Sequence, residues 1–235
     1  MAESDNRFVD EEHWQLFRLL PKDSRWRDAI YAETEPYVVE YQGKVRGREI
    51  VYPRYSVIVG DCIKSAVIEN RTCIEREVQT EDLRPNAKSG LFTYDSLPMI
   101  SWDLVPNVAM IRDHLEQHIS GLKIRICLIN LYCGPPDGKY ANVGGAHNIG
   151  WHSDKEARAN PKKGIPERSV YSLSVGATRK FRFRKVGATS GWDYEYQLED
   201  GEMVWMKPGC QTHWEHCVPK ELRVKDWRLN FTFRP

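Results

Sequence analysis

The chain has 235 residues and a formal net charge of +1 at pH 7, because 34 Lys and Arg residues stand against 33 Asp and Glu residues. Hydrophobic residues make up 41% of the sequence, which is enough to build the core of one domain of this length. The near-zero charge is not typical of a dedicated nucleic-acid-binding protein, and no apolar run is long enough for a membrane-spanning helix, so we expect no membrane partner.

The N-terminal segment is acidic and has no signal-peptide core. Trp14, Phe17 and Leu20 recur at helical spacing, which predicts a short helix from Glu11 to Leu20 that ends before a proline. We therefore expect an N-terminal helical extension over residues 1–40, followed by the main domain over residues 41–235.

Two strands are predicted within residues 36–60, joined by a hairpin turn at Gln42-Gly43. The clearest helix runs from Pro106 to Ser120, since proline suits its first turn and apolar residues recur at positions 108, 111, 115 and 119. Gly121 suits its C-terminal end.

Short strands separated by glycine and proline turns dominate the rest of the chain. They are predicted at residues 124–132, 169–176, 180–186, 193–198, 202–206 and 228–234. A glycine-rich loop from Gly134 to Gly150 interrupts them. This set of elements predicts a mainly β fold, a sandwich or barrel, with flanking helices.

Six cysteines, at positions 62, 73, 127, 133, 210 and 217, form no CxxC pair and no spacing typical of a disulfide framework. Free buried thiols are typical of reducing compartments. The pattern therefore favours an intracellular protein, nuclear or cytoplasmic.

His152-Ser153-Asp154 and His216 offer two imidazoles and one carboxylate. Such a set can occupy one face of an octahedral iron(II) and leave the other positions open. His213 competes with His216 for this role, but their odd separation places them on opposite faces of an extended strand. A structural role is the alternative for each histidine.

Polar side chains occupy alternate positions from Arg228 to Arg234, with apolar ones between them. On a strand, both arginines therefore share one face with Asn230 and Thr232. Such a strand suits the wall of a polar pocket, where a guanidinium fork can bind a carboxylate bidentately. An amphipathic surface strand is the alternative.

The run RLNFTFR at residues 228–234 resembles the terminal motif of the AlkB-type oxidative demethylases. His152-Ser153-Asp154 resembles their metal motif, and residues 212–216 resemble the stretch that carries their second histidine ligand. Asn130-Leu131-Tyr132 resembles their strand that contacts 2-oxoglutarate. Residues 90–94 are similar to the aromatic segment of the nuclear DNA-repair branch. The resemblance runs from about Tyr41 to Arg234, so residues 41–235 are expected to form an AlkB-like dioxygenase domain.

This resemblance implies a double-stranded β-helix (jelly roll) and an iron(II)/2-oxoglutarate-dependent dioxygenase that uses O2. It implies that His152, Asp154 and His216 bind the iron. Arg228 is the expected partner of the remote carboxylate of 2-oxoglutarate, with the Tyr132 hydroxyl as a second donor. The full set of expected 2-oxoglutarate contacts is Asn130, Tyr132, Arg228, Asn230 and Arg234.

The implied substrate is methylated DNA or RNA, from which N-methyl groups are removed with release of formaldehyde and succinate. Phe92 and Tyr94 could stack on the target base, although packing in the core is their alternative. Glu156 could favour a cationic ring such as 1-methyladenine or 3-methylcytosine, although a solvated loop glutamate is equally consistent with the sequence.

Two other functions stay open: an AlkB-like hydroxylase or demethylase of a protein, lipid or free nucleotide, and a non-catalytic binding module. The basic run at residues 179–185 also has two possible roles. Lys180, Arg182 and Arg184 share one strand face, which could bind phosphate groups or simply face solvent. We expect the protein to be a monomer.

Overall fold

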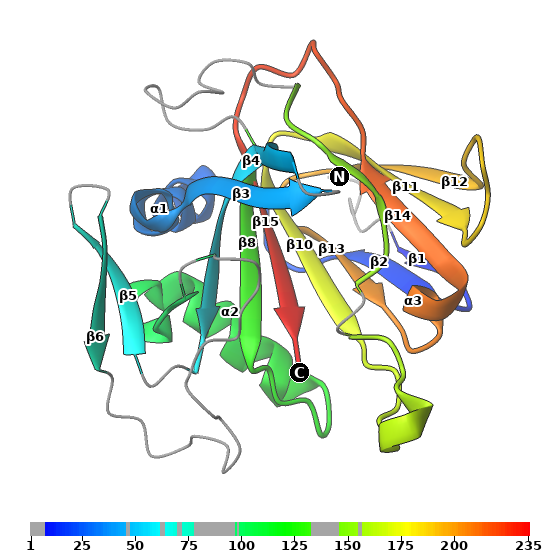
Figure 1. The fold of residues 1–235 in the computed structure, drawn as a ribbon, viewed down its shortest axis with the longest axis horizontal. Helices are drawn as coiled ribbons and strands as arrows, with labels where there is room; N and C mark the ends of the chain where they lie inside the picture. Colours follow the sequence, from blue (N-terminus) through cyan, green and yellow to red (C-terminus); the bar gives the residue numbers. More distant parts are fainter. Residues whose placement is uncertain are drawn as a thin grey trace, which may run out of the picture.

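The structure is a computed structural model that describes residues 8–45, 48–61, 64–69, 72–77, 97, 99–132, 146–154 and 157–235. Antiparallel β-sheets dominate it, with the two longest helices along one side of the largest sheet (Figure 1). This architecture confirms the predicted mainly β fold with flanking helices and is consistent with a jelly roll.

The large sheet has nine strands, and its main path follows the order β1-β2-β13-β10-β15-β8-β4-β3. The bounds along that path are Val9–Asp10, Trp14–Arg18, Glu202–Met206, Val170–Gly176, Arg228–Arg234, Ile126–Tyr132, Arg48–Gly60 and Val39–Val45. The short strand β7 (Met99–Ile100) pairs with β4 in parallel. β15 therefore lies in the middle of the sheet, between β10 and β8.

A second sheet has four strands in the order β12-β11-β14-β9. They span Tyr194–Leu198, Arg179–Lys185, Trp214–Val218 and Ile149–His152. A separate hairpin joins β5 (Lys64–Glu69) to β6 (Thr72–Glu77).

The large sheet buries both of its faces against different partners. Helices α1 (Ser24–Thr34) and α2 (Pro106–His118) share one apolar cluster with it, to which β15 contributes Leu229, Phe231 and Phe233. The four-stranded sheet shares a second cluster with it on the other side, where Phe181 and Phe183 pack. The polar face of β15 points to this second side, toward the space between the sheets.

The helix α2 confirms the prediction for residues 106–120 to within two residues. Val108, Ile111 and Leu115 form its buried stripe, and Gly121 beyond its end has φ +74°. The Glu33 carboxylate on α1 accepts hydrogen bonds from the backbone N–H groups of Asn107 and Val108, at 3.1 and 3.0 Å. These bonds satisfy donors that the first helical turn leaves open and fix α2 against α1.

The helix predicted from Glu11 to Leu20 is wrong, because Trp14–Arg18 forms strand β2. β2 pairs with β13, and Trp14 and Leu16 alternate into the core beneath the second sheet. The apolar spacing also fits a helix, so strand pairing with a distant segment decided between the two. The helix α1, which the sequence reading did not predict, lies a few residues further on.

The hairpin predicted within residues 36–60 is confirmed, but its turn is misplaced. Gln42 and Gly43 lie inside β3, where they pair with Val51 and Ile50 of β4. The five strands predicted at residues 169–176, 180–186, 193–198, 202–206 and 228–234 are all present, as is the strand at 124–132. Strands β9 and β14 were not predicted.

Residues 8–40 contain α1 and the strands β1 and β2, and both strands belong to the large sheet. The division of the chain at residue 40 stays a prediction. Among the described cysteines, Cys127, Cys210 and Cys217 are free and buried, as expected. In the part of the chain that the structure describes, no helix is long and apolar enough to cross a membrane.

Candidate metal centre and the adjoining cavity

Strand pairing brings His152 and His216 together. The two residues are direct partners in β9 and β14, and their ring centroids are 4.3 Å apart. The Nδ1–H of His152 donates to the Gly150 carbonyl at 2.8 Å. That bond orients the ring and leaves Nε2 available as a metal ligand.

Asp154 completes the group just after β9 ends. One ligand atom each from His152, Asp154 and His216 all lie within 4.8 Å of one another. The Oδ1 atom of Asp154 accepts a hydrogen bond from Nη2 of Arg234 at 2.9 Å. Its Oδ2 atom is buried and has no hydrogen-bond partner among the described residues, so a lone pair stays available in this cluster.

The electrostatics of the cluster favour the protonation states that bind a metal. Burial lowers the pKa of His216 to about 3, and the nearby His152 adds to this effect. Burial also lowers the pKa of His152. At Asp154 burial acts to raise the pKa, but the Arg234 guanidinium and the histidines outweigh it and hold the pKa below its usual value. Neutral imidazoles and an ionised carboxylate result at neutral pH.

A cavity of about 570 Å³ opens onto the three side chains. Its floor comes from the polar face of the central strands: β15 contributes Asn230, Thr232 and Arg234, and β8 contributes Asn130 and Tyr132. The predicted polar pocket behind residues 228–234 is therefore present. Strand register explains the grouping, because Asn230 lies opposite Asn130.

Arg228 is almost completely buried, at 1% exposure, in the row of polar residues that adjoins this cavity. Its Nε donates to Ser174 Oγ at 2.8 Å and its Nη2 to Asn230 Oδ1 at 2.9 Å, and the Tyr132 ring lies 5.1 Å from its guanidinium carbon. Its Nη1 is buried without a hydrogen-bond partner among the described residues. Burial lowers the pKa of Arg228 to about 10, so the group remains a cation at neutral pH.

Hydrogen bonds between side chains fix the amides on the cavity floor. Asn130 Oδ1 accepts from Ser56 Oγ at 2.7 Å and from Arg54 Nε at 3.1 Å. Asn230 Nδ2 donates to Thr232 Oγ1 at 3.1 Å. Arg54 also lines the cavity, because its strand β4 pairs with β8. No motif surrounds residue 54 in the sequence, so the sequence did not indicate this role.

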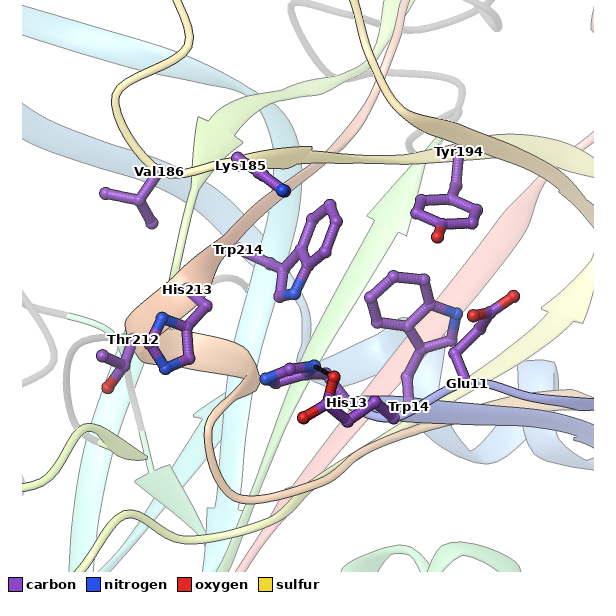
Figure 2. A pocket seen from close by; sticks show the side chains of 10 residues that line it. Glu11, His13, Trp14, Lys185, Val186, Tyr194, Thr212, His213 and Trp214 are labelled. Atoms are coloured by element: carbon purple, nitrogen blue, oxygen red, sulfur yellow. Dashed lines mark ion pairs between the residues drawn. The ribbon is translucent and has the colours of Figure 1, made fainter.

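His213, the alternative ligand, lies away from this cluster. It lines a second cavity, of about 650 Å³, that does not include His216. Figure 2 shows its ring near those of His13 and Trp214. The ring centroids of His213 and His13 are 5.4 Å apart. The choice of His216 over His213 agrees with this cluster, but the premise of the parity argument was wrong, because His213 ends the short helix α3 (Cys210–His213) and only His216 lies on β14.

The basic strand β11 has the predicted alternation, because Phe181 and Phe183 are buried while Lys180, Arg182 and Arg184 are partly exposed. Arg182 pairs with Glu195 at 2.6 Å, and Arg184 pairs with Glu215 at 2.8 Å. Both arginines are thus neutralised by carboxylates on neighbouring strands. This arrangement favours an ion-paired sheet face over a surface that binds phosphate groups.

Three predicted substrate residues, Phe92, Tyr94 and Glu156, lie outside the described residues. Most of the predicted loop from Gly134 to Gly150 does as well, and its last two positions belong to β9. The structure does place Gln211, which the sequence reading did not single out, against the backbone of Asp154.

Comparison with known proteins identifies a matching family and similar proteins. The model of the family described as 2OG-Fe(II) oxygenase superfamily matches residues 61–234. The chain is 28% identical over 257 residues to alpha-ketoglutarate-dependent dioxygenase alkB homolog 3 of Homo sapiens, covering 98% of this chain and 79% of the relative. It is 30% identical over 149 residues to DNA oxidative demethylase ALKBH2 of Mus musculus, covering 61% of this chain and 56% of the relative.

The solved structure of OsALKBH1 has a similar fold, with a TM-score of 0.53 and 19% sequence identity. The superposition covers 97% of this chain and 99% of that one. At this identity the likeness concerns the fold alone.

Proposed function

Because the chain belongs to the 2OG-Fe(II) oxygenase superfamily and is of the AlkB type, we propose that it oxidatively removes N-methyl groups from nucleobases of DNA or RNA. As a member of this family it is a dioxygenase that uses iron(II), 2-oxoglutarate and O2. The observation that carries the proposal is the group of His152, Asp154 and His216 at one end of a cavity with a row of buried polar side chains.

The three side chains fit iron(II) as a donor set. Two imidazoles and one carboxylate are the ligands of non-haem iron(II) oxygenases and leave open positions for a co-substrate and O2. We assign His152, Asp154 and His216 as those ligands. The assignment is supported by Asp154 Oδ2, which has no hydrogen-bond partner in the part of the chain that the structure describes, and by the His152 Nδ1 bond to Gly150, which makes Nε2 the ligand atom. When bound, iron(II) with 2-oxoglutarate and O2 supplies the oxidation of an N-methyl group to N-hydroxymethyl.

The row of polar residues fits a dicarboxylate. We assign Arg228 to the remote carboxylate of 2-oxoglutarate, because the Nη1 group of this buried cation has no hydrogen-bond partner among the described residues. Arg234 lies at the other end, bonded to Asp154, and is assigned to the end of the co-substrate that meets the metal. Asn130, Tyr132 and Asn230 complete the contacts.

Substrate recognition rests on the relatives and on the sequence motif. The human relative is a dioxygenase and the mouse relative is a DNA oxidative demethylase, so a methylated base in DNA or RNA is the substrate class we propose. Phe92 and Tyr94 would stack on that base, and Glu156 would favour 1-methyladenine or 3-methylcytosine through a hydrogen bond to the exocyclic amine. We also propose that the protein acts as a monomer in the nucleus or cytoplasm.

A coupled assay tests the proposed function. The protein is incubated with iron(II), 2-oxoglutarate and DNA or RNA oligonucleotides that carry 1-methyladenine or 3-methylcytosine, and formaldehyde and succinate are measured. We expect both products in equal amounts, and neither from Asp154→Ala. Succinate without formaldehyde from every oligonucleotide would instead favour a protein, lipid or free-nucleotide substrate, and absence of both would favour a binding module.

A further inference from the structure

Gln211 lies at the junction between the second sheet and the proposed metal centre. We propose that it is a positioning residue, whose side-chain amide sets the place of the Asp154 carboxylate relative to His152 and His216. The inference rests on the proposed metal assignment and extends it to a residue that touches neither metal nor substrate.

The contact itself is direct and fully buried. Gln211 has 0% exposure, and its Oε1 accepts a hydrogen bond from the backbone N–H of Asp154 at 2.8 Å. Its Nε2 lies 3.3 Å from the Met206 sulfur, which fixes which end of the amide faces Asp154. A buried N–H without a partner costs free energy comparable to a lost hydrogen bond, so this bond matters to the backbone at Asp154.

Asp154 needs such a support because strand pairing ends before it. The last paired residue of β9 is His152, opposite His216, and Asp154 lies beyond the ladder. Arg234 holds the carboxylate from one side, while Gln211 holds the backbone from the other. Together the two contacts restrict both ends of a short side chain.

Gln211 is itself held in place by other residues. It belongs to the short helix α3 (Cys210–His213), whose N-terminal N–H groups are capped by Glu167: Oε1 accepts from Gly209 at 2.7 Å and from Gln211 at 2.8 Å. Arg158 Nε donates to the Gln211 carbonyl at 2.8 Å, and its Nη2 donates to Ser153 Oγ. Arg158 thus ties the same two segments together a second time.

The expected change in metal affinity can be taken from other metal sites. Residues that orient a metal ligand without touching the metal typically change metal affinity by about 10–100-fold when they are replaced. Gln211→Met keeps the length and volume of the side chain but removes the oxygen acceptor. It should therefore displace Asp154 without leaving a large void.

Titration of the metal-free protein with Mn²⁺, a redox-stable substitute for iron(II), tests the inference by calorimetry. We expect Gln211→Met to raise the Kd for Mn²⁺ by about 10–100-fold. The matched control is Thr212→Val, which alters the neighbouring residue of α3 and its bond to Glu167 but leaves the Gln211 amide in place. That variant should retain Mn²⁺ affinity within about threefold, under roughly 0.7 kcal/mol.

The melting temperatures of both metal-free variants separate positioning from a general loss of stability. If Gln211→Met and Thr212→Val lower the Tm alike and leave the Kd unchanged, the positioning role is overturned. If Gln211→Met does not fold, Gln211→Asn replaces it, since the shorter side chain draws the amide away from Asp154 and should weaken Mn²⁺ binding in the same direction. Asp154→Ala tests the metal assignment separately from the role of Gln211, because unchanged Mn²⁺ binding in that variant would overturn the metal assignment itself.

Discussion

His152 and His216 are direct partners on adjacent strands, so a single backbone register places both imidazoles at one end of the cavity. β14 also pairs with β11, where His216 lies opposite the buried Phe183. The second histidine is therefore fixed by a strand on each side. Asp154 lies beyond this ladder; the Ala157 N–H donates to its carbonyl at 3.0 Å, and side chains hold its backbone N–H and its carboxylate.

Replacement of Asp154 by Ala should abolish succinate formation. The carboxylate is the only anionic group of the proposed ligand set, and its Oδ2 has no other partner among the described residues. Succinate is measured with saturating iron(II) and 2-oxoglutarate, and circular dichroism checks the fold. Glu12→Ala, at a side chain that is 88% exposed, serves as the control. Normal turnover by Asp154→Ala would remove it from the ligand set.

Replacement of Arg228 by Met should raise the KM for 2-oxoglutarate. It would leave the remote carboxylate buried without a cation, which costs about 3–5 kcal/mol. At about 1.4 kcal/mol per factor of ten, the requirement should rise about a hundredfold or more. Arg182→Met is the control, because that guanidinium pairs with Glu195 on the outer face. A change below about threefold, or roughly 0.7 kcal/mol, would place the carboxylate elsewhere.

Gly176→Ala should destabilise the fold and weaken 2-oxoglutarate binding together. Gly176 has φ +95°, and an added Cβ would lie 2.6 Å from the Trp227 carbonyl oxygen. Relief of that clash must move Trp227 and with it the start of β15 at Arg228. We expect a loss of about 1–3 kcal/mol in the free energy of unfolding from the backbone conformation alone.

Gly187→Ala provides the comparison for this prediction, because Gly187 has φ +85° but nothing within 4 Å of an added Cβ. Chemical denaturation and the KM for 2-oxoglutarate are measured for both variants. Only Gly176→Ala should change the KM. Equal effects of the two substitutions would mean that strain, and not contact with Trp227, determines the result.

The metal-free protein should lose stability as the pH falls below about 6.5. Burial lowers the pKa of His216 from its ordinary value of 6.5 to about 3, so in this interval the unfolded chain binds a proton that the folded chain does not. Stability rises with pH wherever the unfolded state binds more protons. The contribution of His216 to the free energy of unfolding is therefore complete above pH 6.5 and declines as the pH falls toward 3. Urea midpoints of chelator-treated protein at two pH values measure it, and His216→Asn should show a smaller decline.

Tyr94→Ala should weaken the binding of methylated oligonucleotides by about 1–3 kcal/mol, the usual range for a base that stacks on an aromatic ring. Succinate formation without nucleic acid should persist, because the metal ligands and Arg228 are unchanged. Fluorescence anisotropy with a single-stranded oligonucleotide measures the binding. Unchanged affinity would indicate that Tyr94 packs in the core.

The sequence alone determined the chemistry of the site, because that information is local. Alternation along residues 228–234 already placed both arginines on one face, and the structure puts that face toward the cavity. The motif also favoured His216 over His213 as a ligand, and the structure places only His216 in the cluster, although His213 lies in helix α3 and not on the extended strand that the parity argument assumed. The mainly β fold followed from short strands between glycine and proline turns, since a side-chain period of two can be read without knowing the partner strand.

Only the tertiary structure decided which segments pair. The apolar spacing of Trp14, Phe17 and Leu20 is compatible with a helix, and pairing of β2 with β13 overrides it. The register of β9 on β14 and the contact of Gln211 with Asp154 join residues that are far apart in the chain. No local pattern encodes such contacts, because they arise when two sheets and their buried polar groups pack and satisfy one another.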